Sequence, residues 1–95
     1  MDDSQTIVVI EGMEFLPEAI NVRVGDTITW YNEDTISHSI ESDEGSEPEQ
    51  EFSSPVILPG ESYSHEFTFP GTLYYHCAIH PEMKAQVYVI PRLPG

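Results

Sequence analysis

Hydrophobic and polar residues alternate along most of this chain of 95 residues, in short runs separated by Gly, Pro and Asp. A period of two is typical of β-strands with one buried face. No segment longer than ten residues shows the 3.6-residue period of a helix. The pattern predicts strands at the following positions: Thr6–Ile10, Ala19–Val24, Thr27–Tyr31, Ile36–Ile40, Tyr63–Phe69, Thr72–Cys77 and Ala85–Ile90.

Short strands at this regular spacing predict an all-β fold, a Greek-key β-sandwich or barrel of seven or eight strands. Gly25-Asp26 and Pro70-Gly71 supply turn signals between them. The length suits a single domain over residues 1–95 with one core. Since Cys77 is the only cysteine, no internal disulfide is available to stabilise that domain.

One segment departs from the alternation. Glu41–Glu51, E-S-D-E-G-S-E-P-E-Q-E, carries six acids and no large apolar side chain. Such a composition buries little surface and predicts a mobile acidic loop at about residues 41–54. The loop is either a solvated connection or a docking element for a basic partner.

The whole chain is acidic, with 17 Asp and Glu against three Lys and Arg and a net charge of −14. This charge disfavours nucleic acid and anionic membrane surfaces as partners and favours a partner with a basic surface. Adaptation to a salty environment is the other explanation. The start M-D-D-S-Q lacks the charged and apolar regions of a signal peptide, and no apolar run approaches the ~20 residues of a membrane span.

The segment Tyr74–Met83, Y-Y-H-C-A-I-H-P-E-M, contains the only cysteine of the chain together with two histidines and a methionine. Cys77, His80 and Met83 follow one another at a spacing of three, and Pro81 prevents a regular continuation of the strand. A tight loop of this kind brings a thiolate, an imidazole and a thioether around one point. Side chains of adjacent strand residues leave opposite faces, so we expect His76 to point away from Cys77.

His38 is the best candidate for a fourth ligand, because it lies in an alternating segment behind Trp30-Tyr31. One thiolate, two imidazoles and a weak thioether form the ligand set of a trigonal type 1 copper site. Zinc fits less well, because structural zinc takes four strong ligands and a methionine offers it nothing. A Cys/His nucleophilic pair is a further alternative, but no orienting group or oxyanion feature accompanies it.

Two stretches are similar to a known family. G-D-T-I-T-W-Y-N-E-D-T-I-S-H resembles the segment that leads to the first histidine ligand of the cupredoxins, the small blue copper proteins related to plastocyanin. F-T-F-P-G-T-L-Y-Y-H-C-A-I-H-P-E-M resembles their carboxy-terminal ligand loop, and its Y-H-C-x-x-H-P-x-M order is similar to the amicyanin branch. The resemblance covers roughly three quarters of the chain, from Gly25 onwards.

The resemblance implies an eight-stranded Greek-key sandwich with one copper ion, Cu(I) or Cu(II), at one end. It implies His38, Cys77 and His80 as equatorial ligands and Met83 as the axial ligand. It also implies one-electron transfer between redox partners, with the imidazole edge of His80 as the electron port, and hence an electron carrier rather than an enzyme. The alternative function is small-molecule redox chemistry, for example on nitric oxide, at an open axial position where water or Glu82 replaces Met83.

Three residues depart from the family pattern. Ser39 stands where an asparagine commonly ties the ligand loops together, and Glu82 stands where the amicyanin branch has a large apolar residue. Ile79 replaces a proline, so its backbone N–H is free to donate to the sulfur of Cys77, a bond that tunes redox potential.

Other residues with distinctive chemistry are interpreted as structural. We expect Trp30 in the core, Met13 either in the core or capping one end of it, His65 in a half-buried packing position, and Tyr74 and Tyr75 on opposite faces. An unpaired cysteine and a copper site are typical of an extracytoplasmic protein. We therefore expect a monomer in a periplasmic, pseudoperiplasmic or cell-surface location, with its export signal or anchor outside this sequence.

Overall fold

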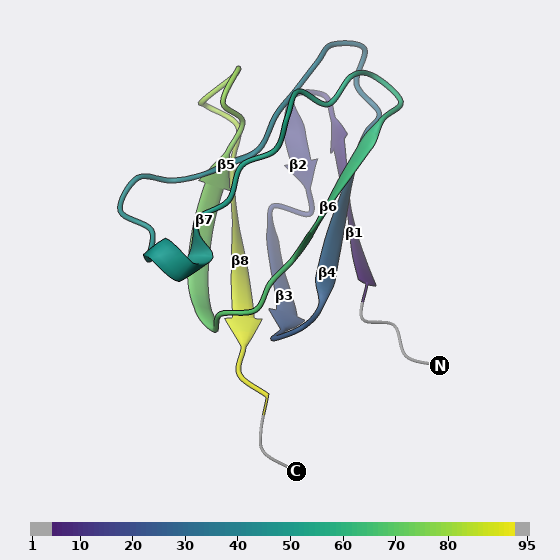
Figure 1. Cartoon of the computed structure of the whole chain (residues 1–95). Helices are drawn as coiled ribbons and strands as arrows, with labels where there is room; N and C mark the ends of the chain where they lie inside the picture. Colours follow the sequence, from purple (N-terminus) through teal and green to yellow (C-terminus); the bar gives the residue numbers. More distant parts are fainter. Residues whose placement is uncertain (1–4, 93–95) are drawn as a thin grey trace.

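The computed structural model describes residues 5–92, which form a sandwich of two four-stranded β-sheets (Figure 1). The first sheet has the order β2 (Glu14–Leu16), β1 (Gln5–Glu11), β4 (Thr27–Asn32) and β6 (Ser62–Glu66). The second sheet has the order β3 (Ala19–Arg23), β8 (Lys84–Ile90), β7 (Gly71–His76) and β5 (Glu41–Ser42). β1 pairs in parallel with β4 and β3 with β8, while the other neighbours are antiparallel. The predicted all-β sandwich is confirmed.

The core follows the predicted alternation. Leu73 and Tyr75 of β7 are buried, whereas Tyr74 between them is 52% exposed, so the expected division of the two tyrosines is confirmed. Trp30 lies fully buried between the sheets, and its indole N–H donates to the hydroxyl of Tyr75 at 3.2 Å. Burial raises the pKa of Tyr75 to about 12, which keeps this phenol neutral.

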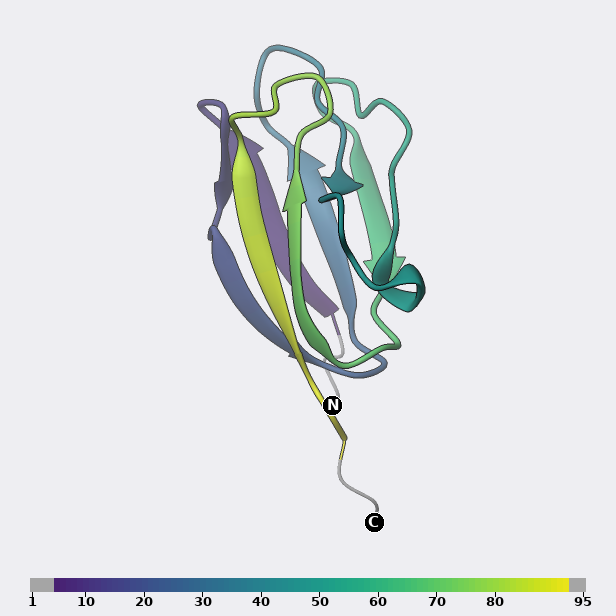
Figure 2. The same ribbon diagram turned by 90° about the vertical axis from the view of Figure 1, so that its left-hand side faces the viewer.

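The ends of the sandwich differ in their connections. The loops that follow β4 and β7 meet at one end, the upper end in Figure 2, together with the chain that precedes β6. β1 begins and β8 ends at the other end. In residues 5–92 there is no helix of the length and apolar character needed to cross a membrane.

The predicted strand Ile36–Ile40 is wrong. The segment has a single isolated bridge, between His38 and Ile57, and no continuous ladder. The reason is that side chains take the backbone N–H groups a neighbouring strand would use: Ser39 N donates to Cys77 Sγ at 3.5 Å and Ile40 N to Ser54 Oγ at 2.9 Å.

β2 was not predicted, because three residues before Pro17 are too few to show an alternation. It is joined to β1 by Gly12 and Met13, which both have positive φ, 63° and 64°. Two consecutive residues of positive φ form the type I′ turn that connects tight hairpins.

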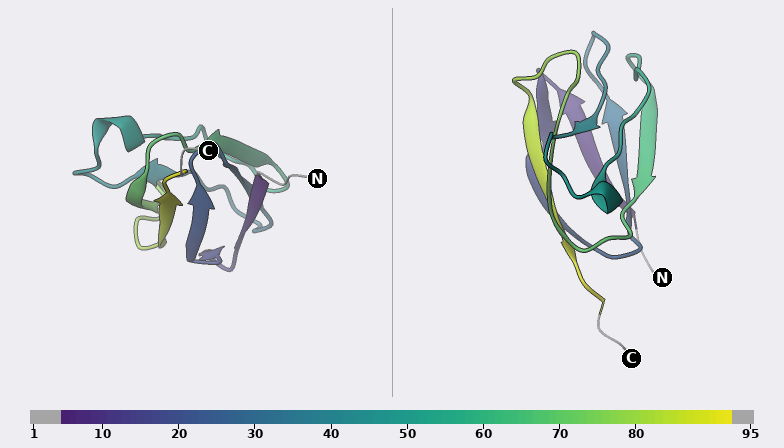
Figure 3. Two further views of the ribbon diagram at one scale, coloured as in Figure 1. Left: turned by 90° about the horizontal axis from the view of Figure 1, so that it is seen from below. Right: turned by 60° about the vertical axis from the view of Figure 1, so that its left-hand side comes forward.

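The acidic segment has more structure than predicted. It contains β5 and a 3₁₀-helix, η1 (Pro48–Gln50), which projects at one side of the sandwich (Figure 3). Its backbone is attached to β7 through Asp43 N, which donates to Tyr74 O at 2.9 Å. Phe52, at the end of the segment, stacks on Trp30 with ring centroids 5.8 Å apart, so an aromatic ring outside the acidic run anchors it to the core.

Candidate metal centre

Three of the predicted side chains meet at the upper end of the sandwich. One ligand atom of each of His38, Cys77 and His80 lies within 4.8 Å of the others. Cys77 Sγ is 3.6 Å from His38 Nδ1 and 3.9 Å from His80 Nδ1. The two imidazole rings meet edge to face at 62°, with their centroids 5.1 Å apart. A sulfur and two nitrogens therefore face one small volume.

The loop that carries Cys77 and His80 is closed by two backbone hydrogen bonds. Cys77 N donates to Met83 O at 3.0 Å, and Met83 N donates to His80 O at 2.9 Å. Met83 is 3% exposed and Cys77 is fully buried, whereas His80 is partly exposed. The predicted spacing of three thus folds into a tight loop with both sulfur-bearing residues inside and one imidazole at the surface.

The sulfur of Cys77 accepts a backbone hydrogen bond from Ser39, at 3.5 Å. In the described part of the chain the backbone donor to this sulfur is Ser39 N. The hydrogen bond that Ile79 N was free to donate is not formed. Ser39 thus joins the two loops through its main chain, whatever its short side chain contributes. Ile79 turns outward and is 46% exposed.

His38 is fully buried and is held from both sides. Its backbone exchanges two hydrogen bonds with Ile57, at 3.1 and 2.7 Å. Its ring nitrogen Nε2 lies 2.9 Å from Oδ2 of Asp34. Because an ionised carboxylate only accepts, the ring donates its Nε2–H there and leaves the lone pair of Nδ1 directed at the cluster.

Asp34 is an ionised partner for this ring. The hydrogen bond from His38 and then the one from Met13 N, at 3.0 Å, lower the pKa of Asp34 below its ordinary value of 3.8. Partial burial acts in the opposite direction and is outweighed. Asp34 N in turn donates to Oδ1 of Asn32 at 2.9 Å.

Sequence reasoning missed Asn32 and Asp34. The only local signal is the spacing N-x-D, which favours an Asx turn at the end of a strand. The partners that give the two residues their role, His38, Met13 and Ile57, lie four to 25 positions away.

His76 points away from the cluster, as predicted. Its ring lies 2.6 Å (Nδ1) from Oδ1 of Asp43 and 3.4 Å (Nε2) from Oε1 of Glu41. His65 lies elsewhere, half-buried and stacked on Phe52 with centroids 4.5 Å apart, which confirms its packing role. Met13 packs against the core at the turn between β1 and β2, as expected.

The surface near the cluster is partly apolar. Loops at this end of the sandwich expose aliphatic side chains to between 42% and 49%: Ile36, Leu58 and Ile79. Glu82 is exposed beside them in the loop of His80. The result is an aliphatic surface with a carboxylate, rather than an uninterrupted apolar face.

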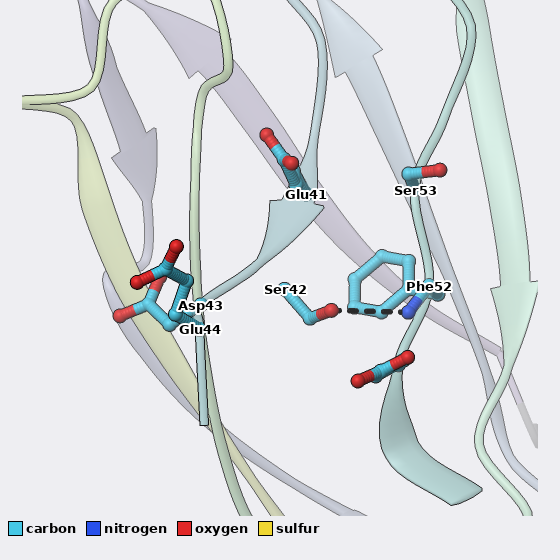
Figure 4. Close-up of a pocket in the computed structure, with 7 residues that line it drawn as sticks. Glu41, Ser42, Asp43, Glu44, Phe52 and Ser53 are labelled. Atoms are coloured by element: carbon cyan, nitrogen blue, oxygen red, sulfur yellow. Dashed lines mark hydrogen bonds between the residues drawn. The ribbon is translucent and has the colours of Figure 1, made fainter. Parts of the chain in front are cut away.

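A separate pocket lies against the acidic segment (Figure 4). It has a volume of about 450 Å³ and is lined by four acids, two serines and a phenylalanine: Glu41, Asp43, Glu44, Glu51, Ser42, Ser53 and Phe52. Phe52 N donates to Ser42 Oγ across it at 3.1 Å. No thiol or imidazole lines this pocket, so its chemistry differs from that of the cluster.

The donor set of the cluster fits copper. A buried thiol and two imidazoles within 4.8 Å provide the soft and borderline ligands that copper prefers, and Met83 on the same loop offers a thioether. Residues 5–92 do not form a set of four strong ligands for structural zinc, because the nearby His76 is turned to Glu41 and Asp43.

Comparisons with known proteins agree with this chemistry. Residues 3–90 match the family described as copper binding proteins, plastocyanin/azurin family. The chain is 34% identical to amicyanin from Paracoccus denitrificans over 87 residues, which cover 92% of this chain and 66% of that protein. The chain thus spans about two thirds of the length of this relative.

Solved structures show the same similarity. The Cu(I) form of an amicyanin variant superposes with a TM-score of 0.83 at 34% identity, covering 94% of this chain and 85% of that one. A copper-containing nitrite reductase (NirK) from Thermus scotoductus superposes with a TM-score of 0.84 at 31% identity, covering 93% of this chain but 23% of the reductase.

Proposed function

The chain belongs to the plastocyanin/azurin family of copper-binding proteins and is a type 1 copper protein of the electron-transfer class. On this basis we propose that one copper ion is held at the upper end of the sandwich by His38, Cys77, His80 and Met83. Copper, when bound, supplies a one-electron Cu(I)/Cu(II) couple. The observation that carries the proposal is the approach of Cys77 Sγ, His38 Nδ1 and His80 Nδ1 within 4.8 Å.

The surrounding residues suit this role. Cys77 and Met83 are buried and joined by a backbone hydrogen bond of 3.0 Å, so their sulfurs are shielded from water. His38 is fixed by the Ile57 backbone and the Asp34 carboxylate. A rigid ligand frame limits rearrangement between the two oxidation states, which favours fast electron exchange.

We place the electron port at His80, because its ring belongs to the cluster and the residue is partly exposed. The redox partner would contact the aliphatic side chains beside it. The pocket and segment around Glu41, Asp43 and Glu44 favour a partner with a basic surface, attracted by opposite charge. Raising the salt concentration should then slow electron exchange with such a partner.

Small-molecule redox chemistry is not favoured. The amicyanin match covers 66% of that protein, whereas the reductase match covers only 23% of that enzyme. The unpaired Cys77 and the copper site support an extracytoplasmic location, and we propose that the chain works there as a monomeric domain.

The test is the visible absorption and electron paramagnetic resonance spectrum of the protein loaded with Cu(II). We expect a strong thiolate charge-transfer band with narrow copper hyperfine splitting in the wild type and in His76→Gln, and neither feature in Cys77→Ala. His76→Gln is the matched control because it removes a neighbouring imidazole outside the cluster. A wild-type spectrum without the thiolate band contradicts the proposal.

Met83 is tested separately. Met83→Leu keeps a buried apolar side chain of similar volume but removes the thioether. We expect a shifted Cu(II) spectrum, while Met13→Leu, at the turn between β1 and β2, leaves the spectrum unchanged. An unchanged Met83→Leu spectrum would instead indicate water or Glu82 at the axial position.

A further inference from the structure

We propose that Asp34 is a positioning residue for His38: its carboxylate holds the imidazole with Nε2–H directed away from the cluster, so that Nδ1 faces Cys77 and His80. The inference rests on the proposed function and adds a residue that touches no ligand atom of the cluster except through His38. It follows from the separate directions in which the two ring nitrogens of His38 are bonded.

The first step is the geometry of the ring. Nε2 lies 2.9 Å from Asp34 Oδ2, and Nδ1 lies 3.6 Å from Cys77 Sγ. His38 is fully buried, so in the folded protein the carboxylate, and not water, is the partner of Nε2. Turning the ring over, or moving its proton to Nδ1, would remove this donor from the carboxylate of a side chain that is only 15% exposed, which is unfavourable. The carboxylate thus selects one ring orientation and one tautomer.

The second step is that Asp34 itself is fixed. Oδ2 also accepts from Met13 N, at 3.0 Å, in the turn whose two residues have positive φ. The other oxygen, Oδ1, accepts from Thr35 N at 3.3 Å. Two backbone donors, one of them in a distant turn, therefore hold this carboxylate independently of His38, and the imidazole adjusts to it rather than the reverse.

The third step is the anchoring of the loop that carries Asp34. Asn32 is 1% exposed, and its Oδ1 accepts from Asp34 N at 2.9 Å. Its amide nitrogen donates to Ile36 O and Ile57 O, at 3.0 and 2.9 Å. Since Ile57 also pairs with the backbone of His38, one asparagine links the carboxylate, its loop and the segment behind the histidine.

The consequence is electrostatic as well as geometric. A carboxylate hydrogen-bonded to the far nitrogen of a ligating imidazole increases the basicity of that ligand. Its negative charge also stabilises the higher positive charge of the two oxidation states. Removing Asp34 should therefore weaken Cu(II) binding more than Cu(I) binding and raise the reduction potential.

The experiment compares Asp34→Ala, Asp34→Asn and Glu33→Gln. Glu33→Gln is the matched control, because it removes one negative charge from the same loop at an exposed residue whose side chain does not bond to His38. The first readout is the ¹⁵N chemical shifts of the His38 ring in the metal-free protein. The second is the reduction potential of the copper-loaded protein.

We expect the wild type and Glu33→Gln to show the Nε2–H tautomer, and Asp34→Ala to show a mixture. Asp34→Ala should lose about 10- to 100-fold in Cu(II) affinity. Each tenfold loss specific to Cu(II) raises the potential by about 59 mV. In Asp34→Asn the amide oxygen still accepts from Nε2–H, so the tautomer is retained and the rise in potential lies between those of Asp34→Ala and Glu33→Gln.

The inference is overturned if Asp34→Ala keeps the Nε2–H tautomer with the potential of Glu33→Gln. If Asp34→Ala does not fold, the smaller change decides: a potential for Asp34→Asn equal to that for Glu33→Gln also overturns it. Failure of the proposed function is distinct, because it shows as the absence of a thiolate band in the wild type, whatever the tautomer in the metal-free protein.

Discussion

His38 and His80 bring their ring nitrogens to one cluster, but the chain surrounds the two rings differently. His38 is fully buried, its backbone is paired with Ile57 and its far nitrogen is bonded to Asp34. His80 is partly exposed, in a loop closed by two backbone hydrogen bonds to Met83. The same side chain thus serves two purposes: His38 provides fixed geometry, and His80 provides access from outside.

The largest expected effect comes from removing each ring in turn. His38→Gly and His80→Gly should both lose the native Cu(II) spectrum, because each removes an imidazole from the cluster. Added imidazole should restore the spectrum of His80→Gly, since the hole opens to solvent. It should fail with His38→Gly, where the hole is closed by protein and the variant also loses stability through its buried cavity.

The control for this pair is the wild type with the same imidazole concentration, whose spectrum should not change. Equal restoration of both glycine variants, followed by visible absorption, contradicts the comparison. It would mean that the loop around His38 opens as readily as the loop of His80.

The second effect tests the stability of the two loops. Asn32→Ala leaves Asp34 N, Ile36 O and Ile57 O without their side-chain partner. We expect a loss of about 3 kcal/mol in the free energy of unfolding, since each buried unpaired group costs roughly 1–3 kcal/mol. Glu82 lies exposed in the loop of His80, so Glu82→Ala should change the free energy of unfolding by no more than about 0.5 kcal/mol.

Urea denaturation of the metal-free proteins measures both changes, so that copper binding does not contribute to the result. Similar midpoints for Asn32→Ala and Glu82→Ala would show that the side chain of Asn32 does not anchor its loop. The expected difference is large because one loop depends on side-chain hydrogen bonds and the other on its own backbone.

The same contrast explains what the sequence could predict of the site. The loop of Cys77 and His80 is built from residues three positions apart, so its order is visible in one short stretch. In the loop before His38, Asp34 and Asn32 depend on Met13 and Ile57, which are 21 and 25 positions away in the chain. A single sequence contains no signal for such contacts, and Asn32 and Asp34 look like ordinary turn residues in it.

The fold, like the site, could be predicted where the signal lies within one short stretch of sequence. Strands with buried and exposed positions in strict alternation, such as β7 and β8, were found from the pattern, although their ends differ by one residue. Ile36–Ile40 alternates equally well but is not a strand, because its N–H groups donate to Cys77 and Ser54 side chains. Periodicity reports which face is buried, not which partner takes the backbone hydrogen bonds.

The smallest effect extends the comparison to a histidine outside the cluster. His65 is half-buried between Phe52 and Phe67, with ring centroids at 4.5 and 4.7 Å. Burial lowers its pKa below 6.5, and the nearby Glu66 carboxylate only partly offsets this. His65 is thus packed between aromatic rings, whereas the buried ring of His38 is hydrogen-bonded to a carboxylate.

The sign of the pH effect follows from this shift. In the unfolded chain His65 takes up a proton near pH 6.5, whereas in the folded protein it does so at a lower pH. Between these values the unfolded state binds more protons, so the free energy of unfolding falls as the pH drops through 6.5. The fall levels off once the pH is below the folded pKa.

His65→Gln cannot take up this proton, so metal-free His65→Gln should lose less stability than the wild type between about pH 7.5 and about pH 5.5. Thermal unfolding at the two pH values measures the difference, and the histidines common to both proteins cancel in it. An identical loss in the two proteins would mean that the aromatic stack accepts the charged ring. Burial between two phenylalanine rings would then not disfavour the protonated form of His65.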